Sequence, residues 1–416
     1  MISFERFHLS NGMRLLVHED PTTPMAVVNV LYNVGARDEE EDKTGFAHLF
    51  EHLMFAGSKN VQSFDEALQR AGGNNNAFTT NDLTNYYEIL PAINLDTALW
   101  VEADRMAHLN INERTLAVQQ SVVSEEFKEH YINQPYGDAS HLLRELAYKN
   151  HPYKWPTIGK ELSHIEKAKL DDVRAFFDSH YQPTNAVLVI AGGVKASEAR
   201  EAAERWFSGY SSNGYMRKAY PPEPYQTEPH RKEVTADVPF DALYLSFHIG
   251  GKMDPGFYPA GVIAELLGSG KSSRLYQHLV KEKKVFTGIE CYLSGSIDPG
   301  LIIIEGQLFP GIKPEEGEKA LWVELEQLKT SRVSERELGK IRNRIEHDLA
   351  TEELDLMSRA FHLAFFELLG DAEWLNHEAE KFQAVGAEDI LQAANDIFKP
   401  TNSSILIYRK LNPTLN

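Results

Sequence analysis

The sequence predicts an α/β (α+β) protein of two homologous domains, each a mixed, mainly antiparallel sheet packed against helices. The chain has 416 residues, which is too many for one compact core and fits two domains of about 200 residues. Residues 209–228 are rich in Gly, Ser, Asn and Pro, a composition typical of a linker. We therefore expect an N-terminal domain at 1–212, a linker at 213–228 and a C-terminal domain at 229–416.

A repeated pattern is the second observation, and it indicates an internal duplication. Residues 181–185 (Tyr-Gln-Pro-Thr-Asn) precede an apolar strand and match residues 398–402 (Phe-Lys-Pro-Thr-Asn) at an offset of 217. Near the start of each half, residues 34–38 resemble residues 250–254 at an offset of 216. The two halves are therefore expected to share one fold.

In the first half, the sequence predicts alternating strands and helices. Residues 3–19 predict a β-hairpin that turns at a Ser-Asn-Gly sequence, and the β-branched run at 25–34 predicts a central strand. Ser63 is placed to cap a helix that ends before a Gly-Gly pair. The other elements expected in this half are strands within 74–88 and at 186–191, and helices at 93–108, 112–149 (broken near 133–137), 163–180 and 196–207.

The second half repeats this alternation after the linker. The elements expected there are strands at 243–249, 286–294 and 300–308, and helices at 256–268, 272–283 and several within 313–396.

Composition and charge restrict the classes of function. The net charge of −19, from 42 basic and 61 acidic residues, argues against a nucleic-acid partner, because phosphate binding needs concentrated Lys and Arg. Cys291 is the only cysteine, which excludes an intrachain disulfide and a thiolate metal cluster. The N-terminus lacks a signal-peptide pattern, and the longest apolar run, 186–194, is far short of the roughly 20 residues of a transmembrane helix. We expect a soluble cytoplasmic protein with no membrane partner.

Residues 45–57 carry the strongest chemical signal. His48, Glu51 and His52 share one face of a predicted helix whose other positions are mostly apolar. Such polar groups in an apolar shell must be paired or metal-bound, because an unsatisfied buried polar group is costly. Zn²⁺ binds neutral imidazole, and a catalytic zinc takes three protein ligands. The competing interpretation, two structural histidines beside an accidental glutamate, is weakened by the burial pattern.

A third ligand has to come from another element, and the predicted helix at 112–149 is the natural source. Its residues Glu125, Glu126 and Glu129 are all available, and composition does not choose among them. In the second copy of the repeat, the positions of the two histidines and the glutamate are held by Ala264, Gly268 and Leu267. Metal chemistry is therefore expected in the first half only.

Residues 74–88 alternate small or polar residues with aromatic ones, as in two short strands, one of which could be a sheet edge. An exposed edge can bind an extended peptide by strand addition. An ordinary hairpin explains the composition equally well.

Together these motifs resemble the pitrilysin family of zinc metallopeptidases, the inverzincins, and specifically its short, half-length type that includes the mitochondrial processing peptidases. The resemblance covers nearly the whole chain. It rests on His48-x-x-Glu51-His52, on Gly73 with 76–79 (Asn-Ala-Phe-Thr) and Thr84-x-Tyr86-Tyr87, on Val122-Val123-x-x-Glu126, on Pro183-x-Asn185, and on Gly268 with 273–276 (Ser-Arg-Leu-Tyr).

The resemblance implies a zinc-dependent endopeptidase acting on peptides or unfolded segments. It implies that one Zn²⁺ per chain is bound by His48, His52 and Glu126. It further implies that Glu51 is the general base, and because Glu51 takes a proton from water, it is not expected to be a ligand. The strand residues that the resemblance assigns to the substrate backbone are Asn76, Ala77 and Phe78.

Two departures from the family pattern bear on support and partners. Gln119 stands where members often have a Glu seven residues before the metal-binding Glu, which is expected to alter the support of that ligand. In the second domain, Val280 and Thr287 stand where the family has an Arg and a Tyr that hold substrate near the zinc. We therefore expect a heterodimer in which a homologous partner chain supplies the Arg and the Tyr; a homodimer is the alternative.

Two competing functions come from other classes. A non-catalytic core or scaffolding subunit of a larger complex would have no need to retain both histidines, Glu51 and Glu126. A metal-storage or peptide-binding module would keep the ligands but tolerate loss of Glu51.

Overall fold

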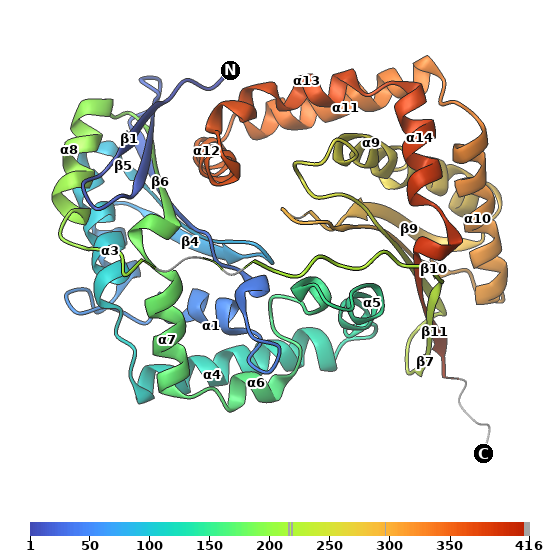
Figure 1. Cartoon of the computed structure of the whole chain (residues 1–416), viewed down its shortest axis with the longest axis horizontal. Coiled ribbons are helices and arrows are strands. Elements are labelled where there is room, and N and C mark those ends of the chain that lie inside the picture. The colour runs from blue at the N-terminus through green and yellow to red at the C-terminus, as the bar shows by residue number, and fades with distance from the viewer. Residues whose placement is uncertain (215–216, 218, 296, 412–416) are drawn as a thin grey trace. The chain divides into compact units, whose positions relative to one another are not determined.

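The computed structural model describes residues 1–214, 217, 219–295 and 297–411, which form two compact units, each with one sheet (Figure 1). Unit 1 comprises Met1–Phe127, Trp155–Tyr220 and Leu349–Glu378. Unit 2 comprises Lys128–Lys154, Pro221–Asp348 and the chain from Ala379 onward. The expected α/β class with two homologous halves is confirmed. Residues 215, 216 and 218 of the expected linker lie outside the described residues, and the domain boundaries stay a prediction.

The sheet of unit 1 has six strands in the order β1-β2-β6-β3-β5-β4. Their bounds are β1 (Glu5–His8), β2 (Arg14–Glu19), β3 (Met25–Tyr32), β4 (Asn74–Thr79), β5 (Thr84–Pro91) and β6 (Ala186–Gly192). The predicted hairpin is β1–β2, and the β-branched run is β3, which lies between β6 and β5 and is buried almost throughout. β4 is the expected edge strand and is also one arm of a hairpin with β5. Peptide binding at this edge stays a prediction.

Unit 2 repeats this sheet without the first strand. Its order is β7-β11-β8-β10-β9, with bounds β7 (His230–Ala236), β8 (Ala242–His248), β9 (Phe286–Leu293), β10 (Leu301–Leu308) and β11 (Ser403–Lys410). When β1 is left out, each sheet has five strands, and the first two of them are parallel: β2 with β6, and β7 with β11. The other neighbouring pairs among these strands are antiparallel. The strand order and directions therefore match position by position.

The duplication extends to hydrogen bonds made by single side chains. Asp38 accepts from the amide of Gly35 at 2.9 Å, and Asp254 accepts from the amide of Gly251 at 2.7 Å. The amide of Asn185 donates to a helix-end carbonyl five residues earlier, as that of Asn402 does in the second half. These shared turns explain why the repeat is readable in the sequence.

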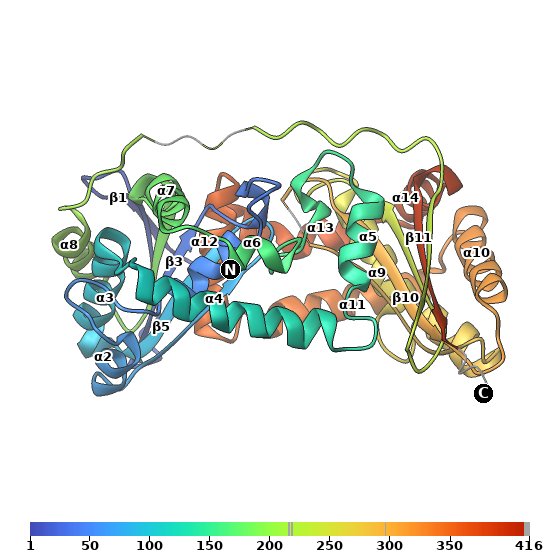
Figure 2. The ribbon, with the colours of Figure 1, turned by 90° about the horizontal axis from the view of Figure 1, so that it is seen from below.

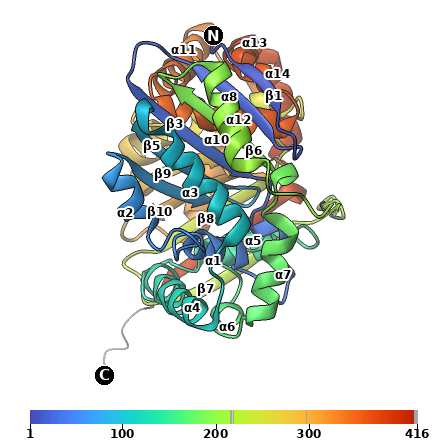
Figure 3. The same ribbon diagram turned by 90° about the vertical axis from the view of Figure 1, so that its left-hand side faces the viewer.

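Helices cover both faces of each sheet. Unit 1 contains α1 (Phe46–Leu53), α2 (Phe64–Arg70), α3 (Leu95–His108), α4 (Glu113–Phe127), α6 (Leu162–Glu166), α7 (Leu170–His180), α8 (Ala196–Phe207) and α12 (Leu356–Leu369). α3 and α8 lie together over one face of its sheet, as Figure 3 shows. Unit 2 contains α5 (Ala139–Ala147), α9 (Phe257–Gly268), α10 (Pro314–Thr330) and α14 (Ala387–Ile397), while α11 (Glu335–Glu352) and α13 (Glu378–Ala384) contribute to both units.

Each sheet is covered on one face by a helix from the other half of the sequence. α12 packs on β3 and β6 of unit 1, where Leu363 is fully buried. α5 packs on β8 and β11 of unit 2 through Leu143 and its neighbours. The starts of the two helices, Ala139 and Leu356, are 217 residues apart, which is the offset of the repeat. They are therefore equivalent elements that the two halves exchange.

One predicted helix is wrong in detail. Residues 163–180 form two helices, α6 and α7, because Lys169 is extended and starts a new helix. Carbonyls at the break accept hydrogen bonds from the side chain of Gln120, at 2.8 Å for Ile165 and 3.0 Å for Ala168. Among the described residues, no helix is both long and apolar enough to cross a membrane.

Candidate metal centre

The predicted motif helix is α1, and its start is held by a buried carboxylate. Glu39 accepts hydrogen bonds from the amides of Gly45 and Ala47, both at 2.9 Å. Those amides belong to the first turn, which has no partners within the helix. Gly45 has a left-handed backbone (φ 87°), and a Cβ there would lie 2.7 Å from the carbonyl oxygen of Ile158. Glycine is therefore required for the entry into α1.

Glu39 is a functional candidate that sequence reasoning missed. It is 7% exposed, and burial raises the pKa of its carboxyl, although the two amides that donate to it oppose the shift. In the sequence it is one of five consecutive acidic residues, 38–42, which suggest an exposed loop. Nothing in that run distinguishes the one carboxylate that turns inward to cap α1.

α1 is held in the unit by aromatic packing on the side away from its histidines. The ring of Phe50 stacks on Phe176 and Phe177 of α7, with ring centroids 5.4 and 6.0 Å apart. α1 also packs on α4, the teal helix in Figure 2. These contacts fix the helix axis, so the histidine side chains project toward α4 from a rigid element.

Three of the predicted residues converge between α1 and α4. Nε2 of His48 lies 3.7 Å from one carboxylate oxygen of Glu126, and Nε2 of His52 lies 3.4 Å from the other. One ligand atom from each of the three residues lies within 4.8 Å of the other two. Of the three glutamates that the sequence left open, Glu126 is the one in this cluster. Glu125 and Glu129 are exposed.

The two distances, each to a different carboxylate oxygen of Glu126, are near the donor separation of a zinc site. Two donors bound at about 2.0 Å with a tetrahedral angle lie about 3.3 Å apart, close to the separations of Glu126 from the two histidines. Burial lowers the pKa of His48 to about 4, with His52 adding to the shift and Glu126 opposing it. His48 is therefore neutral near pH 7, which is the form that binds metal. The donor set and its spacing suit zinc with one position left open for water.

Glu51 lies on the same helix as His48 and His52 but is not part of the cluster that they form with Glu126. Its carboxylate accepts a hydrogen bond of 2.6 Å from the hydroxyl of Thr79, the last residue of β4. Burial raises the pKa of the Glu51 carboxyl, and the hydrogen bonds from Thr79 oppose that shift. A carboxylate in this place can exchange a proton with a molecule that occupies the open position of the metal.

The three predicted substrate-binding residues lie on β4, at the edge of the sheet. Asn76 is exposed, and its side-chain oxygen accepts a hydrogen bond of 2.9 Å from the amide of Ala77. Phe78 points to the opposite face of the sheet from Thr79 and packs edge-on against Phe361 of α12, with centroids 5.1 Å apart. The strand thus offers an open backbone edge next to the metal cluster, with side chains alternating between two faces.

A buried ionic cluster supports the strand next to β4 and was also missed. Arg105 of α3 is 1% exposed and contacts the carboxylates of Glu88, on β5, and Glu102. Its guanidinium lies 4.4 Å from the ring centroid of Tyr86 and 5.7 Å from that of Phe55. Phe55 follows α1 in the chain, so Arg105 joins β5 to the exit of the motif helix. The spacing of Glu102 and Arg105 on a helix face was the available signal.

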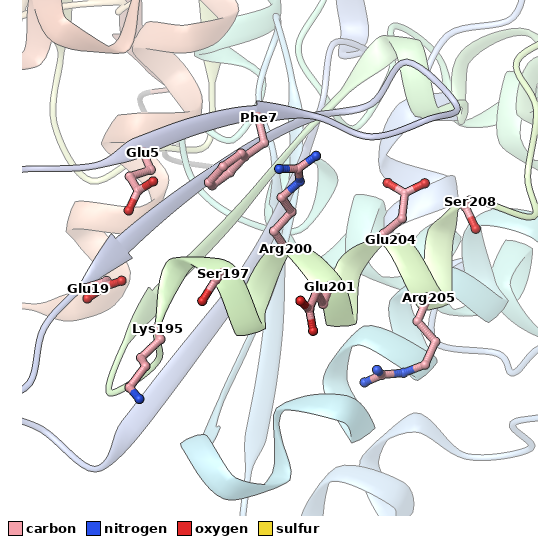
Figure 4. Close-up of a pocket in the computed structure, with 10 residues that line it drawn as sticks. All are labelled: Glu5, Phe7, Glu19, Lys195, Ser197, Arg200, Glu201, Glu204, Arg205 and Ser208. Atoms are coloured by element: carbon pink, nitrogen blue, oxygen red, sulfur yellow. The ribbon is translucent and has the colours of Figure 1, made fainter.

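A surface groove of about 810 Å³ lies elsewhere in unit 1, between β1, β2 and α8 (Figure 4). Arg200 lies over the ring of Phe7 there, with 5.2 Å between the guanidinium carbon and the ring centroid. Several of its charged groups have partners already, for example Glu204 with the amide of Ser10 and Arg205 with Asp96. The metal cluster, with its convergent donors, is the stronger candidate for chemistry.

Comparisons with known proteins identify the family of this chain. Residues 14–161 match the family model described as Insulinase (Peptidase family M16), and residues 167–345 match the model described as Peptidase M16 inactive domain. The chain is 30% identical to the zinc protease PqqE of Helicobacter pylori, over 97% of this chain and 92% of that protein. It is 28% identical to an uncharacterized zinc protease, YmxG, of Bacillus subtilis, over 73% of each.

A solved structure described as a protease from Helicobacter pylori has a TM-score of 0.92 at 29% identity, covering 98% of this chain and all of that one. Two more distant relatives are named as subunits of assemblies. They are a probable mitochondrial-processing peptidase subunit beta of Arabidopsis thaliana, 27% identical over 49% of this chain and 39% of that protein, and the cytochrome b-c1 complex subunit 1 of Bos taurus, 26% identical over 49% and 42%.

Proposed function

Because the chain belongs to the insulinase family of peptidases, M16, we propose that it is a zinc-dependent endopeptidase that hydrolyses peptides or unfolded segments, with Glu51 as general base. The observation that carries the proposal is the convergence of His48, His52 and Glu126, with Glu51 adjacent to that cluster but not part of it. Glu126 is the third ligand in this proposal, and one Zn²⁺ is bound per chain.

The residues of this chain divide the reaction between them. When bound, zinc lowers the pKa of water and polarises the scissile carbonyl. Glu51 takes a proton from the attacking water and passes it to the leaving amine. The hydrogen bond from Thr79 holds the Glu51 carboxylate in place for this transfer. The edge of β4, with Asn76, Ala77 and Phe78, binds the substrate backbone by strand addition. Catalysis then depends on β4 and α1 together.

Three glutamine variants test the assignment. Glu51→Gln is expected to keep zinc and to lose about 10²- to 10⁴-fold in kcat, because a positioned general base contributes about that much. Glu126→Gln is expected to lose both zinc and activity. Glu125→Gln is the matched control, since it changes the neighbouring, exposed glutamate on the same helix. Zinc content is measured by elemental analysis, and hydrolysis is measured with an unfolded polypeptide as substrate. A fully active Glu51→Gln enzyme would contradict the mechanism.

We also propose that this chain works with a homologous partner chain that supplies an Arg and a Tyr. Val280 and Thr287, the positions at which the family resemblance places that pair, lie in a π-helical segment (Tyr276–Glu282) and on β9. The subunit names of the two distant relatives support the same idea. Robust activity of the purified homodimer would remove the need for a partner.

The alternative is a non-catalytic core subunit, which the cytochrome b-c1 relative brings into consideration. The convergence of three metal-binding side chains argues against it. A purified chain without stoichiometric zinc, and without activity after zinc is added, would favour this alternative.

A further inference from the structure

A hydrogen bond joins the open edge of the sheet to the proposed general base. The hydroxyl of Thr79 donates to one carboxylate oxygen of Glu51 at 2.6 Å. Thr79 is the last residue of β4, and β4 is the last strand of the sheet. A residue of the edge strand therefore contacts Glu51 directly.

The inner side of this strand is fixed, and its outer side is open. Thr79 pairs with Thr84 and Ala77 pairs with Tyr86 on β5. Thr84 and Tyr86 are fully buried, and the hydroxyl of Thr84 donates to the carbonyl of Val34 at 2.9 Å. In the sheet, the other side of β4 has no neighbouring strand. The outer backbone edge of β4 is thus the side at which an added strand can pair.

The alternation of side chains along β4 places Thr79 on the face of the sheet against which α1 packs. Ala77 and Thr79 share the face against which α1 packs, whereas Phe78 packs on Phe361 at the opposite face. A peptide added to β4 would restrain the backbone of Thr79 and, through it, the hydroxyl that holds Glu51. The same peptide would carry its scissile bond toward the metal cluster.

We propose that Thr79 is a positioning residue that couples peptide pairing along β4 to the orientation of the Glu51 carboxylate. The inference rests on the proposed function, because it takes Glu51 as the general base. A substrate that occupies β4 both presents its own peptide bond and orders the group that accepts the proton from water. Extended, unfolded segments meet this requirement, because their backbone is free to pair along β4.

The substitution Thr79→Val isolates the hydroxyl, because valine keeps the shape and the β-branched backbone preference of threonine. We expect kcat for an unfolded peptide of about ten residues, long enough to pair along β4, to fall about 10- to 100-fold. This is the loss expected from one hydrogen bond to a charged group. KM is expected to stay within about twofold, since the backbone edge of β4 is unchanged. Zinc content and the melting temperature should match the parent enzyme.

Two further variants separate positioning from structure. Thr79→Ser restores the hydroxyl and is expected to recover kcat to within about threefold of the parent. Thr22→Val is the matched control: Thr22 also donates its hydroxyl to a carboxylate, that of Asp20, in an exposed loop of unit 1. It should leave kcat unchanged. A Thr79→Val enzyme with the parent kcat, or a loss of kcat that serine does not rescue, overturns the inference.

Glu51→Gln, measured in the same series, distinguishes failure of this inference from failure of the proposed function. If Glu51→Gln keeps the parent kcat, the general base is wrongly assigned and the proposed function fails with it. If Glu51→Gln is inactive while Thr79→Val is fully active, only the coupling through Thr79 is refuted. If both lose kcat and serine rescues the second, the coupling is supported.

Discussion

The exchanged helix α12 makes a quantitative prediction about stability. Leu363 is fully buried on the sheet of unit 1, although it comes from the last quarter of the sequence. Leu363→Ala removes three carbons worth about 0.8 kcal/mol each, or roughly 2.4 kcal/mol of transfer free energy. The cavity left behind adds to this loss, because a packed site relaxes only partly. We therefore expect unit 1 to lose about 3 to 4 kcal/mol of unfolding free energy.

Equilibrium unfolding in urea, followed by tryptophan fluorescence, measures this loss. Four of the five tryptophans lie in unit 1, and only Trp322 lies in unit 2, so the signal reports mainly on the unit that α12 covers. Leu354→Ala is the control, because Leu354 precedes α12 and is 79% exposed; its effect should stay within about 0.5 kcal/mol. A loss of less than about 1 kcal/mol for Leu363→Ala would refute the packing of α12 on this sheet.

Two further predictions concern charged groups in unit 1. Hydrogen bonds from Thr22, together with Arg359 of α12, lower the pKa of Asp20 to about 2, against about 3.9 in unfolded chains. The contribution of Asp20 to stability is therefore present above about pH 4 and is lost as the pH falls toward 2. Asp20→Asn should lower the melting temperature at pH 7, and by progressively less between pH 4 and pH 2. A difference in melting temperature between variant and parent that grows on acidification would contradict this. Arg105→Met leaves the buried carboxylates of Glu88 and Glu102 without their cation and should cost about 3 to 5 kcal/mol in urea unfolding. The triple variant that also carries Gln at both glutamates should recover part of that loss, and an equal loss in both variants would count against the ionic explanation.

Local patterns were sufficient for much of the fold and for the central motif. The alternation of apolar runs and turns predicted β3 between its neighbours, and the Pro-Thr-Asn turns identified the duplication, because each rests on residues close together in the chain. The face shared by His48, Glu51 and His52 likewise follows from the period of a helix. One error, the single helix predicted at 163–180, arose because the break depends on Gln120, a residue far away in the sequence.

The sequence by itself determined the helix that carries two imidazoles and a carboxylate, the absence of that set from the second half, and the duplication of the fold. The tertiary structure decided which glutamate joins the histidines, because Glu126 faces α1 only once α4 has packed against it. It also decided that Glu39 caps α1 and that Thr79 holds Glu51. Above all, it decided that α5 and α12 are exchanged between the halves. An amphipathic helix encodes which of its faces is apolar but not which of two similar sheets it will cover, so that choice is made only by packing.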